Sequence, residues 1–260
     1  MVKTSLQGNI IFRARSVLYK KYWQAGFATR LYDLLAPEVY LDSLRHAVEC
    51  VPDGEGKVWL DAGCGSGLAL HFLTDQLRRG DRYMGIDILA QGLSAALAKS
   101  KTFGLEKSVL AVRADLSLAL PLKEKSVDIV FAHFVMHVVG DAGRRMEVLS
   151  EFRRVLKPGG ILVLTCPARA YNSENIIRES LALARERYGI VRWSIRKWIY
   201  YPAALALGLR YVESQLKTGV WHGYALDELK DEVQAAGFAV RRAEPVYANS
   251  ACFVTAKPVS

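Results

Sequence analysis

The stretch that decides the fold is V-W-L-D-A-G-C-G-S-G, Val58 to Gly67. Its first three residues are apolar and favour a buried β-strand, and an acid and three alternate glycines follow directly. Glycine permits a sharp turn and lets a ligand approach the backbone closely. Residues 68–73 then have helical spacing. The stretch therefore predicts a strand, a loop and a helix whose first N–H groups face a ligand.

The spacing of these glycines distinguishes between classes of ligand. Dinucleotide-binding loops have the pattern G-x-G-x-x-G, whereas this loop reads G-x-G-x-G and follows Asp61. The carboxylate would repel an anionic pyrophosphate, but it would attract a cofactor that carries an ammonium and a sulfonium. On these residues the sequence resembles the class I S-adenosylmethionine-dependent methyltransferases, whose first motif has this arrangement of acid and glycines.

The acids that follow the next two predicted strands agree with the same cofactor. Tyr83–Asp87 is expected to be a strand that ends in an acid twenty residues after Gly67. A carboxylate at this distance can accept hydrogen bonds from both hydroxyls of a ribose, and capping of the next helix is the alternative. A third strand over 108–112 leads to Asp115, where the family places an acid or polar residue beside the adenine amino group.

Two later passages extend the resemblance to about residues 56–167. Residues 126–134 are expected to form a fourth strand, similar to a hydrophobic passage of the family. A helix over 142–156 leads into L-K-P-G-G at 156–160, in which proline should end the helix and the glycines should reverse the chain. A fifth strand over 161–165 follows, and this order is highly characteristic of these methyltransferases.

The alternation of strands and helices predicts an α/β fold with a parallel sheet. The resemblance implies a Rossmann-like, seven-stranded, mostly parallel sheet flanked by helices, with an antiparallel last strand. We expect a helical N-terminal cap over 1–57 and a methyltransferase domain over 58–260, with a helical insertion at 168–223 after strand five. Residues 30–37 resemble the helical lid of related enzymes. Because ligands bind beyond the carboxyl ends of such strands, cap and insertion can both cover the site.

The net charge of +9 is unevenly distributed over the 260 residues. Residues 1–30 carry six basic residues and no acid, and residues 168–218 carry nine basic residues against four acids. Most tryptophans lie in or beside these two segments. Basic residues among aromatics suit an anionic membrane surface, nucleic acid, or a solvated face over an apolar pocket.

The cysteines and the apolar runs indicate the cellular compartment of the protein. The four cysteines are scattered and have no metal-binding spacing, as is usual for reduced thiols. The N-terminus lacks the continuous apolar stretch of a signal peptide, and the longest apolar run, residues 199–209, is too short to span a bilayer. We expect a cytoplasmic protein, with peripheral membrane association as a further expectation.

The resemblance assigns cofactor-binding residues by their position, with Asp61 near the amino acid moiety of the cofactor, Asp87 on the ribose and Asp115 near the adenine. The full set comprises Asp61, Ala62, Gly63, Cys64, Gly65, Gly67, Asp87, Ile88, Asp115, Leu116 and His133.

Methyl transfer from a sulfonium is an in-line displacement, so the protein must chiefly align the nucleophile and exclude water. A general base is needed only if the nucleophile arrives protonated. His133 is the first candidate base, followed by His137 and His222, although the His-x-x-x-His spacing also matches a common helix-packing pattern. No Glu or Cys completes a ligand set with the first two, so we expect no metal.

The aromatic residues of the two basic segments indicate a hydrophobic small-molecule substrate, quinone- or lipid-like by analogy with the ubiquinone and menaquinone methyltransferases that the core resembles. The basic charge leaves an RNA methyltransferase as an alternative, and a non-catalytic cofactor-binding adaptor is a third possibility. Nucleic acid is the less favoured partner, because no RNA-binding module is appended, and the oligomeric state stays open. The predicted substrate residues are Tyr19, Trp23, Tyr32, His137, Tyr171 and Trp198.

Overall fold

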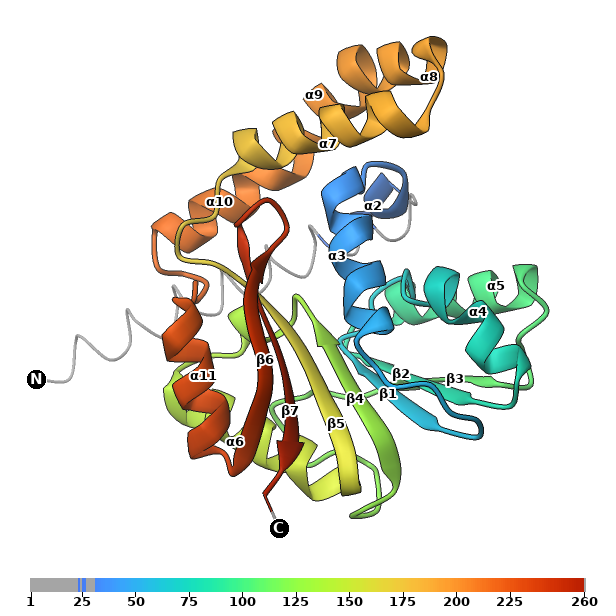
Figure 1. The fold of residues 1–260 in the computed structure, drawn as a ribbon, viewed down its shortest axis with the longest axis vertical. Coiled ribbons are helices and arrows are strands. Elements are labelled where there is room, and N and C mark those ends of the chain that lie inside the picture. The colour runs from blue at the N-terminus through green and yellow to red at the C-terminus, as the bar shows by residue number, and fades with distance from the viewer. Residues whose placement is uncertain (1–22, 24, 27–30, 260) are drawn as a thin grey trace, which may run out of the picture.

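The centre of the protein is a seven-stranded sheet with the strand order β3-β2-β1-β4-β5-β7-β6. The computed structural model, drawn in Figure 1, describes residues 23, 25, 26 and 31–259. Strands β1 to β5 are parallel, whereas β7 is antiparallel to both β5 and β6. This confirms the predicted fold class. The strands are β1 (Val58–Ala62), β2 (Arg82–Asp87), β3 (Val109–Arg113), β4 (Val127–His133), β5 (Leu156–Pro167), β6 (Phe238–Val246) and β7 (Ala251–Pro258).

Helices cover both faces of this sheet. On one side lie α3 (Glu38–Glu49), α4 (Leu70–Arg78) and α5 (Ala90–Thr102), and on the other lie α6 (Ala142–Val155) and α11 (Leu226–Ala235) (Figure 1). The short α2 (Leu31–Leu34) precedes α3. Of the expected N-terminal cap, residues 1–22, 24 and 27–30 lie outside the described residues.

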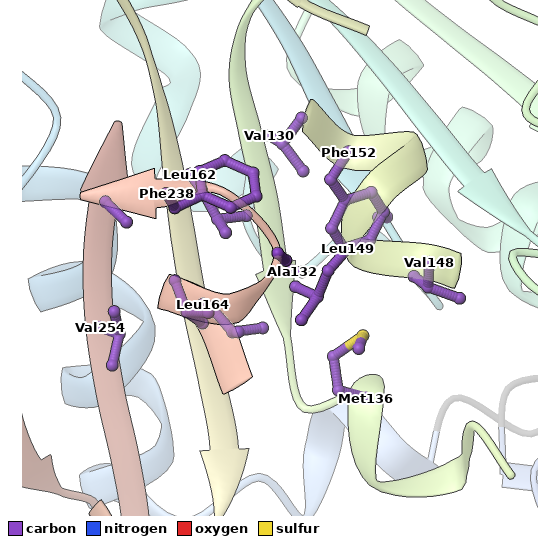
Figure 2. Close-up of a cluster of buried hydrophobic side chains, with 14 of the residues drawn as sticks. Val130, Ala132, Met136, Val148, Leu149, Phe152, Leu162, Leu164, Phe238 and Val254 are labelled. Carbon is purple, nitrogen blue, oxygen red and sulfur yellow. The ribbon is translucent and has the colours of Figure 1, made fainter. Parts of the chain in front are cut away.

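The central strands are mostly apolar because both of their faces are buried. In β4, Val130 and Ala132 point to the core under α6 and α11, while Ile129 and Phe131 point to the core under α3 and α4. Figure 2 shows the first core, in which Phe152 of α6 packs over β4 and β5. The two cores make the sheet a rigid support for the loops at its carboxyl edge.

The L-K-P-G-G passage differs from the expected turn. Helix α6 ends at Val155, and β5 begins at once at Leu156, five residues before the predicted Ile161. Its pairing with β4 jumps from Leu156 to Ile161, so the intervening residues bulge out of the ladder. Proline cannot continue a helix, and Gly159 has a φ of +80°, which accommodates a bulge without reversing the chain.

The insertion after β5 forms an arm of two adjacent helical segments, which extends above α3 in Figure 1. The first is α7 (Ser173–Arg187), and the second runs without interruption over 190–217. Pro202 lacks the N–H that would bond to the carbonyl of Trp198, and five-residue π-helical turns before and after it accommodate this loss. The second segment comprises α8 (Ile190–Ile195), η2 (Arg196–Tyr200), α9 (Tyr201–Ala204), η3 (Leu205–Leu209) and α10 (Arg210–Lys217).

Candidate active site

The glycine-rich loop after β1 is held in one conformation by its backbone. Gly63, Gly65 and Gly67 have φ values of +77°, +51° and +71°, which side-chain-bearing residues rarely adopt. A Cβ atom on Gly63 would lie 2.5 Å from Cγ2 of Val135. The N–H groups of Gly63 and Cys64 both donate to the carbonyl of Ile86, at 2.8 and 3.0 Å, which fixes the loop against the end of β2.

Asp87, the acid at the end of β2, also holds this loop. Its Oδ2 accepts from the N–H of Gly65 at 2.9 Å, and its Oδ1 accepts from the N–H of Leu89 at 2.8 Å. Burial raises the pKa of this carboxyl above its ordinary value. The N-cap of α5 is Leu89, so Asp87 does not cap that helix. Each carboxylate oxygen retains a lone pair for a ligand hydroxyl.

Asp61 lies deeper, and only 4% of its surface is exposed. Its Oδ2 accepts from the hydroxyl of Tyr83 at 2.5 Å. Burial raises the pKa of Asp61 to about 7, against an ordinary value of 3.8. No ion pair to this carboxylate is found within the described part of the chain. A cationic ligand would therefore favour its ionised form.

Two cavities meet beside these residues. A polar cavity of about 80 Å³ is lined by the glycine loop, Asp61, Asp87 and His133. An apolar cavity of about 350 Å³ is lined mostly by aromatic and aliphatic side chains of α2, α3 and the arm. The residues that line both cavities are Trp23, Tyr32, Tyr40, Phe134 and His137.

The two predicted histidines are buried and neutral. Burial lowers the pKa of both His133 and His137 to about 3. The Nε2 atom of His133 lies 3.4 Å from Oγ of Ser43, and its ring stacks on Phe131. The Nδ1 atom of each ring is buried without a hydrogen-bond partner among the described residues. Because such an atom is costly to leave unpaired, a ligand polar group is its expected partner.

A cluster of charged residues ties the segment before α3 to the glycine loop. The hydroxyl of Ser66 donates to Oδ1 of Asp33 at 2.5 Å, and Nζ of Lys99 lies 2.9 Å from Oδ2 of the same carboxylate. Lys99 also donates to the carbonyl of Ser66 at 2.9 Å. Sequence reasoning missed Ser66 and Lys99. The only feature of the sequence that pointed to this contact was the resemblance of residues 30–37, which include Asp33, to the helical lid of related enzymes.

The structure brings six of the eleven predicted cofactor residues together around the polar cavity. Asp61, Gly63, Cys64, Gly65, Asp87 and His133 line the polar cavity. Asp115 does not line this cavity, and its Oδ1 accepts from the N–H and the hydroxyl of Ser117 at 2.9 and 2.7 Å. The other predicted residues that do not line it are Ala62, Gly67, Ile88 and Leu116.

Some of the predicted substrate residues line the apolar cavity and others do not. Trp23, Tyr32, His137 and Tyr171 line the apolar cavity. Trp198 lines neither cavity and is 70% exposed on the arm. Tyr19 lies outside the described residues. Sequence reasoning missed the lining residues Tyr40, Phe134 and Tyr247, which come from three distant parts of the chain and share no motif.

Two further predictions concern His222 and metal binding. Nε2 of His222 lies 2.9 Å from Oε1 of Glu228, and His222 lines neither cavity. Among residues 23, 25, 26 and 31–259, no group of three His, Cys, Asp or Glu side chains is placed to hold a metal ion.

Comparison with known proteins identifies the central part of the chain. The methyltransferase domain family matches residues 60–164. The malonyl-[acyl-carrier protein] O-methyltransferase of Yersinia pestis is 34% identical over 114 residues, which are 42% of this chain and 36% of that protein. The demethylmenaquinone methyltransferase of Oceanobacillus iheyensis is 33% identical over 108 residues, 42% of this chain and 43% of that protein. The chain therefore spans less than half the length of these curated relatives.

A solved structure shares the fold over nearly the whole chain. A S-adenosylmethionine-dependent methyltransferase of Aquifex aeolicus superposes with a TM-score of 0.58 at 18% identity, and covers 89% of this chain and 98% of its own.

The residues of the polar cavity fit S-adenosylmethionine, the cofactor of this family. Asp61 can neutralise a positive charge, and Asp87 can accept hydrogen bonds from ribose hydroxyls. At Gly63, which packs closely against Val135, the loop presents only its backbone to the cavity. The chain therefore contains a methyltransferase domain of the class I, S-adenosylmethionine-dependent family.

Proposed function

We propose that the protein transfers a methyl group from S-adenosylmethionine to a hydrophobic small molecule, quinone- or lipid-like in character. The single observation that carries this proposal is the apolar cavity of about 350 Å³, which adjoins the polar cavity at five shared residues. A cavity of this size suits a small organic molecule, and its apolar lining favours a substrate with a large hydrophobic part.

The bound cofactor supplies an electrophilic methyl group on a sulfonium. In this proposal Asp61 and Asp87 hold the cofactor, and Tyr40 and Phe134, which line both cavities, exclude water from the junction. His137 lines both cavities as well, and its neutral imidazole can accept a hydrogen bond from a substrate hydroxyl at Nδ1. With a pKa of about 3, His133 serves better as a neutral hydrogen-bonding group than as a proton acceptor.

The experiment is incubation of the protein with methyl-labelled S-adenosylmethionine and with lipid, water-soluble small-molecule and RNA fractions of cells. We expect label in the lipid fraction, and its loss with Asp87→Asn. Label in RNA would favour the second candidate, an RNA methyltransferase. The net charge of +9 favours that candidate, because RNA is anionic. Cofactor binding without transfer to any fraction would favour the adaptor.

We also propose a cytoplasmic location with peripheral membrane contact. Cys50, Cys64, Cys166 and Cys252 are all free thiols, as is usual in a reducing compartment. No helix among the described residues is long and apolar enough to cross a membrane. Fractionation of cells into soluble and membrane material, with a salt wash of the membranes, would test both parts of this proposal.

A further inference from the structure

The second helical segment of the arm exposes an apolar face. Exposed positions recur every three or four residues from Val191 to Ala206. Val191 is 69% exposed, Trp198 70% and Ile199 60%. We call this face the apolar stripe. It comprises Val191, Ile195, Trp198, Ile199, Pro202 and Ala206.

The charged residues within the helical segment that carries the apolar stripe are all positive up to Arg210. Between Gly189 and Arg210 the sequence has four basic residues and no acid. Arg196 is paired with the buried Glu38, at 2.8 Å, whereas Arg192, Lys197 and Arg210 form no ion pair within the described part of the chain. Arg192 and Arg210 are exposed near the two ends of the stripe.

Lys197 is placed beside the most exposed tryptophan. Its Nζ lies 4.8 Å from the ring centre of Trp198 and 5.0 Å from that of Trp193. Tryptophan, lysine and arginine together are typical of segments that lie at the boundary between lipid head groups and hydrocarbon. An unpaired positive charge at this position is complementary to an anionic lipid head group.

The apolar stripe is continuous with the apolar cavity. Leu207 follows Ala206, is 56% exposed and also lines the cavity, together with Ala204, Gly208 and Leu209 of the same helical segment. One helix therefore has an outer apolar face and also forms a wall of the proposed substrate site. Leu207 is therefore the residue at which the exposed face and the cavity wall adjoin.

We propose that the apolar stripe inserts into the surface of an anionic phospholipid bilayer and that the apolar cavity takes its substrate from that bilayer. The route of the substrate rests on the proposed function, whereas binding of the stripe to lipid does not. The arm is held to the body of the protein by Arg187, whose guanidinium lies 2.6 and 2.8 Å from the carboxylate oxygens of Asp42. The inserted helix therefore keeps the cavity next to the bilayer.

The test is sedimentation of the full chain with vesicles of phosphatidylcholine alone or mixed with phosphatidylglycerol. We expect binding to the anionic vesicles, weakened about tenfold or more in a Trp198→Ser, Ile199→Ser variant because the inserted apolar area is lost. Lys197→Gln should weaken it about fivefold, and salt should weaken it in the unaltered protein. Leu118→Ser is the matched control, since Leu118 is 64% exposed and is not part of the arm, and its loss should change nothing.

A second measurement locates the contact and does not depend on a loss of binding. Lipids brominated in their acyl chains should quench the fluorescence of the unaltered protein, and a Trp198→Phe variant should lose most of that quenching while it still binds.

Absence of binding to anionic vesicles would overturn the proposal, and so would equal binding by the Trp198→Ser, Ile199→Ser variant. A dimer that this variant abolishes, without vesicle binding, would assign the stripe to a second copy instead. Because no methyl transfer is measured here, these results are independent of the labelling experiment. Vesicle binding without labelled product would contradict only the proposed function.

Discussion

The Tyr83 hydroxyl lies 2.5 Å from Oδ2 of Asp61 and donates a hydrogen bond to it inside the protein. This bond lowers the pKa of the carboxyl, but burial outweighs it and raises the pKa to about 7. The pKa of Asp61 therefore lies near neutral pH, well above its ordinary value, before a ligand binds. A cationic cofactor would shift this carboxyl to the ionised form.

The raised pKa of Asp61 predicts how stability depends on pH. Between its ordinary pKa of 3.8 and about 7, the folded protein holds a proton that the unfolded chain has lost. Stability from this group should fall as pH rises through that range, by at most roughly 4 kcal/mol, since one pKa unit corresponds to about 1.36 kcal/mol. Asp61→Asn should remove this decline. Thermal unfolding of both proteins without cofactor across the range would measure it, and parallel curves would contradict the assignment.

The close packing of Gly63 predicts that a methyl group there is costly. In Gly63→Ala the new Cβ would meet Val135 at 2.5 Å, at a φ of +77°. We expect a loss of about 2–4 kcal/mol in the free energy of unfolding, from the collision and the left-handed backbone together. Gly56→Ala is the control, since Gly56 has a φ of +71° and open space around it, and should lose only about 1 kcal/mol. The measurement is the free energy of unfolding in denaturant. If both variants lose the same amount, the collision with Val135 is relieved and the prediction is wrong.

The contacts of Lys99 predict that it positions the glycine loop. Lys99→Met should release both Asp33 and the carbonyl of Ser66. Affinity for S-adenosylmethionine, measured by calorimetry, should fall about fivefold, because a partly buried charge-assisted bond contributes about 1 kcal/mol. Lys101→Met changes an exposed lysine of the same helix and should leave the affinity unchanged. If both variants bind alike, the contact has no role in holding the loop.

The ion pairs of Glu38 with two arginines of the arm should contribute to the stability of the arm's attachment. Its side chain is 2% exposed, and it pairs with Arg196 at 2.8 Å and with Arg187 at 3.7 Å. Because Glu38→Gln leaves Arg196 without its counter-charge, we expect a loss of about 3 kcal/mol in stability. The control Glu49→Gln, at an exposed position of α3, should lose almost nothing. Faster proteolysis within residues 173–217 of the Glu38→Gln protein would show that the arm is the part released.

The sequence was enough to predict the sheet and the acids of the polar cavity. Apolar runs that each precede a glycine or an acid mark β1 and β2, so Asp61, Gly63 and Asp87 could be placed at the ends of these strands from local order, and the family resemblance supplied their expected roles. Parallel strands end at the same edge of a sheet, which brings these residues together without further information.

The remaining features depend on contacts between distant segments. Tyr40, Phe134 and Tyr247 meet in the apolar cavity although they are far apart in sequence, and no periodicity encodes that meeting. Asp115 follows β3 in the expected order, but it does not line the polar cavity, and Ser117 donates to one of its carboxylate oxygens. For Trp198 the sequence indicated an aromatic residue in a basic segment, and only the fold of the arm decides which way that residue faces.

The central claim, that an apolar cavity receives the methyl acceptor, is tested most directly by introducing a charge into that cavity. Val212 of α10 lines it and is only partly buried, so the protein should tolerate Val212→Asp. The measurement is transfer of labelled methyl from S-adenosylmethionine to a lipid extract, alongside calorimetry of cofactor binding. The account predicts that transfer is lost while cofactor affinity is unchanged. Undiminished transfer, or transfer only to RNA or to water-soluble molecules, would contradict it.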